Sequence, residues 1–180
     1  MTVLFSAVLL VLALAVVMLF AMIGELASRV EESGHGVQKS LMPLEEAQLG
    51  HRPSRWPAEL GELPESATQS AAVLVLSASC RSCGKLAKQL VSERSEWAPR
   101  LHGVVISAAS LDRAREFQQT NELYGFNLFL DDGGEWTTGE FGIQTSPVAL
   151  MMRDGRLDAA YILDDLNLLA PLMPLRTEAV

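Results

Sequence analysis

The hydropathy pattern begins with an uncharged apolar run. No residue from Val3 to Ile23 carries a side-chain charge, and the first charge after the run is Glu25. About 20 apolar residues, at a rise of roughly 1.5 Å each, are enough to cross the ~30 Å hydrocarbon layer of a membrane. We therefore predict that residues 1–24 form a transmembrane anchor, which contacts the membrane through residues 3–23.

A cleaved signal peptide is the main alternative for this run. Such a peptide begins with basic residues, and residues 1–5 contain none. Ala21 makes a poor cleavage site, and Ala27-Ser28 makes a slightly better one. A lipid-modified start and a buried soluble helix are weaker alternatives, so we expect the run to be retained.

Residues 25–49 follow as a predicted polar linker. Residues 41–70 then hold four of the eight prolines, and this density excludes long helices and central strands. The stretch fits two interpretations, an irregular lead-in packed over the edge of the domain or a mobile linker. The four prolines are Pro43, Pro53, Pro57 and Pro64.

From residue 71 onward, strand and helix patterns alternate. Short apolar runs predict three buried strands, at residues 72–78, 101–108 and 127–131. Apolar residues at helical spacing predict three helices, at residues 84–94, 111–123 and 163–173. Asp154-Gly155 between two further apolar runs, 147–152 and 157–162, predicts a β-hairpin. The order predicts an α/β domain whose parallel strands carry an antiparallel hairpin.

The charge of the chain narrows the classes of partner. Acidic residues outnumber Lys and Arg by 22 to 14, and the formal net charge is −8. The basic residues form no cluster, which argues against a nucleic-acid-binding surface. Asp131-Asp132 and Asp164-Asp165 are better explained as turn and helix-cap residues than as calcium ligands.

The two cysteines of the chain form a Cys80-x-x-Cys83 pair between the strand at 72–78 and the following helix. A cysteine at a helix N-terminus favours the thiolate, and Arg81 and Lys85 add positive charge nearby. Thiolates are the nucleophiles of disulfide exchange. Cys80 is therefore predicted to attack a disulfide, and Cys83 to resolve the mixed disulfide.

Three other roles for the pair remain open. A zinc site usually needs four ligands, and the three histidines lack ligand spacing. A structural disulfide would close a very short loop and gain little entropy. Two reduced core cysteines are the third alternative. We expect a redox-active dithiol that uses no metal and no bound cofactor.

Together, these motifs resemble the thioredoxin-like superfamily, especially its membrane-anchored TlpA/ResA-like branch and, within it, maturation proteins of the MauD type. The resemblance covers roughly residues 50–175 and leaves a tail at 176–180. Besides the dithiol, its matching positions are Phe141-Gly142-Ile143, Ser146-Pro147 and Asp154-Gly155. The resemblance implies a thioredoxin-like fold, with a central mixed sheet flanked by helices and preceded by the anchor.

The resemblance also assigns a role to Ser146 and Pro147. It implies that their peptide bond is cis and that both residues bind the substrate beside Cys80. The residues alone also fit an ordinary trans proline that starts an edge strand. Two departures from the family pattern stand out. Ser79 replaces the usual Trp, and the apolar stretch Val73–Leu76 lacks the usual buried acid.

The function that we expect is a membrane-anchored, extracytoplasmic thiol–disulfide oxidoreductase. It would reduce or isomerise disulfides of a client protein, and it could receive electrons from a membrane donor or a larger membrane complex. Stable disulfides belong to oxidising compartments, which outweighs the contrary positive-inside signal of Arg29 and Lys39. The alternative is a non-catalytic thioredoxin-like subunit or assembly factor of a membrane complex.

Overall fold

The computed structural model describes residue 18, residues 41–65 and residues 70–173. Except for Met18, the predicted anchor lies outside the described residues, as do the linker up to residue 40 and the tail at 176–180. Within the described residues, no helix is both long enough and apolar enough to cross a membrane.

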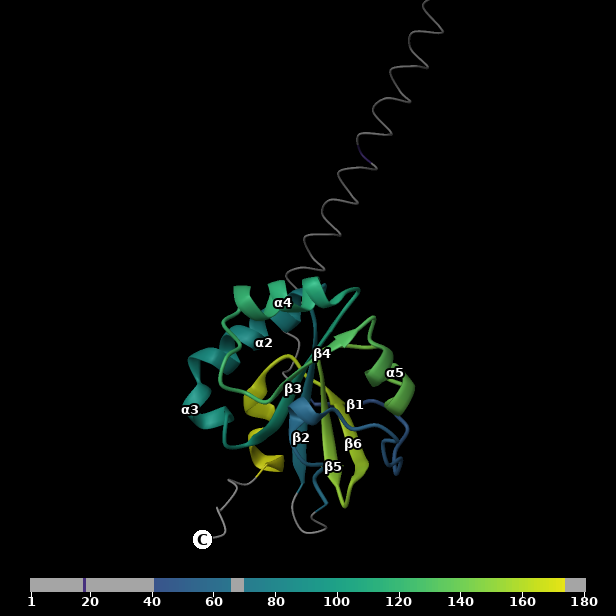
Figure 1. Cartoon of the computed structure of the whole chain (residues 1–180). Coiled ribbons are helices and arrows are strands. Elements are labelled where there is room, and N and C mark those ends of the chain that lie inside the picture. Colours follow the sequence, from purple (N-terminus) through teal and green to yellow (C-terminus); the bar gives the residue numbers. More distant parts are fainter. Residues whose placement is uncertain (1–17, 19–40, 66–69, 174–180) are drawn as a thin grey trace, which may run out of the picture. The chain divides into compact units, whose positions relative to one another are not determined.

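The described elements follow the predicted alternation of strands and helices (Figure 1). In chain order they are β1 (Met42–Pro43), η1 (Ala58–Leu60), β2 (Ala71–Ser77), α2 (Arg81–Ser92), α3 (Arg94–Trp97), β3 (Leu101–Ala108), α4 (Leu111–Thr120), β4 (Leu128–Asp132), α5 (Glu135–Phe141), β5 (Val148–Arg153), β6 (Arg156–Ile162), η2 (Leu166–Leu168) and η3 (Ala170–Leu172). The elements labelled η are short 3₁₀ helices.

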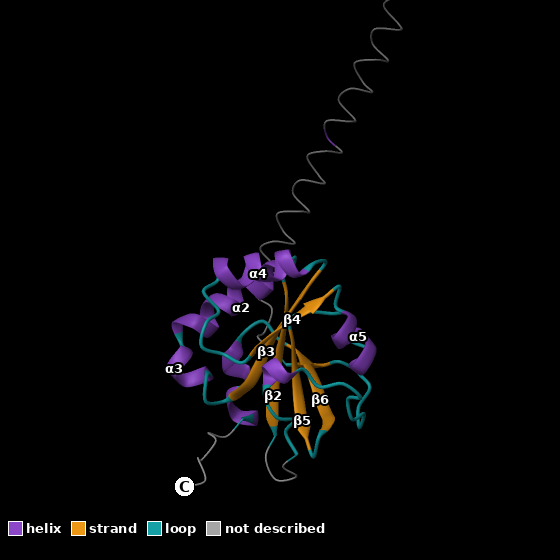
Figure 2. Cartoon of the chain, in the orientation of Figure 1, coloured by secondary structure: helices purple, strands orange, loops and turns teal. Residues whose placement is uncertain are grey.

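The strands form one mixed sheet in the order β1-β6-β5-β2-β3-β4. β2, β3 and β4 are parallel, whereas the β5–β6 hairpin pairs antiparallel with β2. Helices lie on both sides of this sheet (Figure 2). The chain therefore has the thioredoxin-like fold that the resemblance implied, with β2 at the centre of the sheet.

Alternate residues of β2 supply the two hydrophobic cores. Leu74 and Leu76 belong to the core that includes the buried face of α2, whereas Val73 and Val75 pack in the core that includes Trp136 of α5. Side chains alternate between the two faces of a strand, and here both faces are covered. This explains why β2 is an uninterrupted apolar run in the sequence.

The described part of the proline-rich stretch, residues 41–65, is a packed lead-in. β1 pairs antiparallel with β6, and Leu44, Ala47 and Leu60 are all buried. Of the two interpretations of this stretch, the structure supports packing over the edge of the sheet. Residues 41–49, which the sequence placed in the linker, already pack on the domain.

The expected α-helix over residues 163–173 is wrong. The structure has two short 3₁₀ helices there, η2 and η3. The Asp165 carboxylate accepts a hydrogen bond from the Asn167 N–H at 3.0 Å and so starts a separate turn. Pro171 has no N–H to donate to the carbonyl of Asn167, which an α-helix would require. The predicted helix over residues 163–173 took no account of Pro171.

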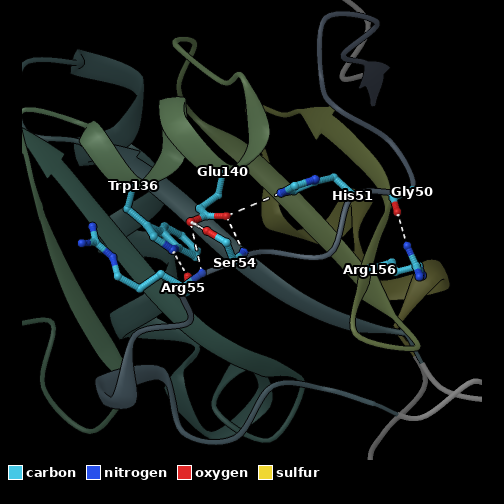
Figure 3. A network of polar contacts seen from close by, with 7 residues as sticks. All are labelled: Gly50, His51, Ser54, Arg55, Trp136, Glu140 and Arg156. Atoms are coloured by element: carbon cyan, nitrogen blue, oxygen red, sulfur yellow. Dashed lines mark hydrogen bonds and ion pairs between the residues drawn. The ribbon is translucent and has the colours of Figure 1, made fainter.

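Glu140 on α5 ties the lead-in to the rest of the domain (Figure 3). Its carboxylate accepts hydrogen bonds from the Ser54 N–H at 2.6 Å, the Ser54 hydroxyl at 2.7 Å and the Arg55 N–H at 3.1 Å. His51 Nε2 lies 3.5 Å from the same carboxylate. The Trp136 indole donates to the Arg55 carbonyl at 2.7 Å, so two residues of α5 hold one short segment.

This network makes the stability of the domain sensitive to acid. Burial alone would raise the pKa of Glu140, but hydrogen bonds from Ser54, His51 and Arg55 outweigh it and hold that pKa below its usual range. The pKa of Glu140 is lower in the folded state than in the unfolded chain, where it is about 4.3. The ionised carboxylate therefore stabilises the fold fully above this unfolded-state pKa. This stabilisation is lost as the pH falls through the pKa of Glu140 in the folded state.

We expect Glu140→Gln to lower the free energy of unfolding by roughly 1–3 kcal/mol at neutral pH, because the neutral amide accepts these hydrogen bonds less strongly. Urea unfolding of the full chain measures the change, and exposed Glu62→Gln is the control. The difference from the wild type should shrink toward about pH 3. Equal stability of Glu140→Gln and the wild type at neutral pH would contradict this role of Glu140.

Candidate active site

The two cysteines occupy unequal positions at the start of α2. Cys80 is the N-cap residue in extended conformation, and its sulfur accepts a hydrogen bond from the Cys83 N–H at 3.4 Å. Cys83 lies on the same buried face of α2 as Leu86 and Leu90, and its exposed fraction is 0%. Cys80 is only partly buried, so the outer of the two thiols is open to a partner.

Strand pairing brings a distant loop to the dithiol. β5 runs antiparallel to β2 with Val148 opposite Val75, so the residues just before β5 lie at the carboxyl end of β2. The Ser146-Pro147 peptide bond is cis, as the resemblance implied. The Cys80 sulfur lies 3.6 Å from the Ser146 carbonyl oxygen.

All four residues predicted for the site therefore belong to one region of the molecule. Cys80 and Cys83 come from α2, and Ser146 and Pro147 come from the loop before β5.

Hydrogen bonds favour the thiolate of Cys80. Desolvation opposes ionisation, but hydrogen bonds from the side chains and backbones of Cys83 and Ser82 outweigh it and lower the pKa of Cys80 below its ordinary value. The Ser82 hydroxyl lies 2.9 Å from the Cys80 sulfur. The side chains of Arg81 and Lys85, on which the sequence argument relied, are exposed, where water and salt screen their charge.

Burial has the opposite effect on Cys83. Desolvation, reinforced by the Cys80 side chain, raises the pKa of Cys83 to about 12, although its sulfur accepts a hydrogen bond from the Ser77 N–H at 3.2 Å. A thiol with so high a pKa stays protonated at neutral pH. The site therefore pairs an exposed, acidic thiol with a buried, protonated one.

The two departures from the family pattern are visible in the structure. Val73–Leu76 are buried and apolar, and Ser79 is exposed. Asp131 on β4 is a buried acid, but its oxygens accept from the N–H groups of Trp136 and Thr137 at 2.8 and 3.0 Å. Asp131 therefore binds the N–H groups at the start of α5 from the end of β4, while Gly134 is the N-cap residue.

Two contacts of the dithiol were not predicted from the sequence. Ser82 could have been found, because it lies between the cysteines in the first turn of α2. The bond from the Ser77 N–H to the Cys83 sulfur depends on how α2 packs against the end of β2. No spacing in the sequence reveals this contact.

No protein-family model and no curated protein matches the sequence. Solved structures to which the chain is similar include the thioredoxin domain of a thiol-disulfide oxidoreductase from Bacteroides vulgatus, at 13% identity and a TM-score of 0.45 over 60% of this chain and 81% of that one. StoA from Bacillus subtilis is 19% identical, with a TM-score of 0.43 over 68% and 91% of the two chains. A secreted disulfide oxidoreductase from Mycobacterium tuberculosis is 15% identical, with a TM-score of 0.40 over 60% and 87%.

Proposed function

We propose that the chain is a thiol–disulfide oxidoreductase that reduces or isomerises disulfides of a client protein. The observation that carries the proposal is the contrast between the two thiols. Cys80 is partly exposed and has a lowered pKa, whereas Cys83 is fully buried within reach of it. Disulfide exchange begins with an attacking thiolate, and a second thiol within reach of the first can resolve the mixed disulfide.

The reaction proceeds in two exchanges. The Cys80 thiolate attacks one sulfur of the client disulfide, which forms a mixed disulfide and releases the other client sulfur as a thiolate. Cys83 then loses its proton and attacks the Cys80 sulfur. The Cys80–Cys83 disulfide forms, the bond to the client breaks, and two electrons have passed to the client. Ser146 and Pro147 hold the client segment beside Cys80.

A non-catalytic subunit is the rival function. It would use the domain as a docking surface, and the apolar Val73–Leu76 stretch and the exposed Ser79 are compatible with that role. The rival gives no reason for the hydrogen bonds that Ser82 and Cys83 make to the Cys80 sulfur. These bonds favour the oxidoreductase.

The test uses single substitutions in the full chain. Cys83→Ser should accumulate mixed disulfides with client proteins, because the attack by Cys80 proceeds and its resolution fails. Cys80→Ser is the matched control and should trap few partners or none, because Cys83 is buried and protonated. Non-reducing electrophoresis after acid quenching measures the trapped species. Equal trapping by both variants would contradict the proposal.

We also propose that residues 3–23 anchor the chain in a membrane, with the dithiol on the extracytoplasmic side. The support is the uncharged apolar run in the sequence and the oxidising compartment that stable disulfides require. A membrane electron donor or a larger membrane complex would then return Cys80 and Cys83 to the dithiol state.

The location is tested with a membrane-impermeant thiol reagent. After treatment with an impermeant reductant, intact cells or spheroplasts should show labelling of the wild-type chain and not of Cys80→Ser, since Cys83 is buried. Labelling that requires cell lysis would place the domain in the cytoplasm, and recovery of the chain in the soluble fraction would overturn the anchor.

A further inference from the structure

A hollow lies at the carboxyl ends of two neighbouring parallel strands. Ser77 of β2 and Ser107 of β3 are partners in register, and the residues at and after these strand ends, 77–79 and 107–109, are all serine or alanine. Their small side chains line a hollow of about 470 Å³, which we call the strand-end hollow. Ligand pockets typically measure about 300–1,000 Å³, so it has room for a side chain of a bound segment.

The strand-end hollow adjoins the attacking cysteine. Ser79 lines the hollow and directly precedes Cys80, whose N–H donates to the carbonyl of Ser77, another lining residue, at 3.1 Å. The carbonyl of Ser146 approaches the Cys80 sulfur from the loop before β5. Because β2 lies between β5 and β3 in the sheet, that loop and the β3 wall of the hollow are on opposite sides of the end of β2. A client segment beside Ser146, with its disulfide at Cys80, can therefore extend into the hollow.

Among the described residues that line the hollow, Arg113 is the one that carries a charge. It lies in the first turn of α4, whose N-terminus has a partial positive charge and also favours an anion. The Glu116 carboxylate is 3.8 Å from the Arg113 guanidinium, and both side chains are exposed, so this ion pair is weak. The nearby Asp112 carboxylate accepts a hydrogen bond from Arg115 at 2.9 Å. The Arg113 guanidinium can therefore bind a carboxylate that enters the hollow.

We propose that the strand-end hollow is a specificity pocket for an acidic side chain of the client, close in sequence to the client's disulfide cysteine, and that Arg113 binds its carboxylate; this rests on the proposed oxidoreductase function. A guanidinium presents its N–H donors in a planar fork that matches the two oxygens of a carboxylate. The hydroxyls of Ser79 and Ser107 line the same hollow and can donate further hydrogen bonds. Binding there holds the client disulfide beside Cys80.

The test uses short peptides with a single cysteine whose sulfur is joined to 2-pyridinethiol as a disulfide. The Cys80 thiolate of the reduced full chain attacks the peptide sulfur, and absorbance follows the pyridinethione that is released. Glutamate or glutamine is placed in turn at each position within a few residues of the cysteine. Each rate is divided by the rate of dithiothreitol with the same peptide, which removes the effect of the substitution on the peptide's own reactivity.

At the position that reaches the hollow, the glutamate peptide should react roughly twofold to fivefold faster than the glutamine peptide, and added salt should reduce this preference. Arg113→Gln should abolish the preference, whereas Arg113→Lys should keep part of it, because lysine retains the charge without the planar fork. Lys88→Gln is the matched control, because it removes the same charge from an exposed position outside the hollow. Ala109→Leu narrows the hollow and should abolish the preference without slowing the reaction with 2-hydroxyethyl disulfide.

The proposal is overturned if the wild-type chain reacts equally with the glutamate and glutamine peptides at every position, or if Lys88→Gln loses the preference as fully as Arg113→Gln. A preference that survives Ala109→Leu would also overturn it, because the carboxylate would then bind outside the hollow. Failure of the oxidoreductase function would look different, because the wild-type chain would then release pyridinethione from both peptides no faster than Cys80→Ser does.

Discussion

The burial of Cys83 beneath Cys80 is the constraint on which the site depends. α2 packs one face into the core, which withdraws Cys83 from water and leaves Cys80 at the open end of the helix. The same burial keeps Cys83 protonated, and the hydrogen bonds of the first turn favour the thiolate of Cys80. A single helix orientation thus gives two chemically identical side chains different exposure and shifts their pKa values in opposite directions.

The pairing of the strands brings the second half of the chain to the dithiol. Because β5 pairs antiparallel with β2, the loop that holds Ser146 meets the dithiol at the point where β2 ends. α5 stands on the opposite core from α2 and is held by the Asp131 cap and by the bonds of Glu140 to the lead-in. The position of α5 therefore depends on contacts with β4 and with the lead-in.

Much of this arrangement could be predicted from the sequence, because hydrophobic patterns and turn residues within short segments determine it. The apolar run before Cys80 predicted β2, and the Asp154-Gly155 turn predicted the β5–β6 hairpin. The cis bond before Pro147 was implied by the family resemblance. The last helix was wrong because Pro171 removes a backbone donor. The approach of the Ser146 carbonyl to the Cys80 sulfur depends on strand pairing across more than sixty intervening residues, which no local pattern encodes.

The most direct test of the account is the redox equilibrium of Cys80 and Cys83 in the full chain. The chain is equilibrated in buffers of graded thiol–disulfide ratio and alkylated, and the oxidised fraction is read by mass. The account predicts that the pair interconverts fully between dithiol and intramolecular disulfide along one two-electron curve. A pair that stays reduced under oxidising buffers, or that forms only disulfides between chains, would contradict it.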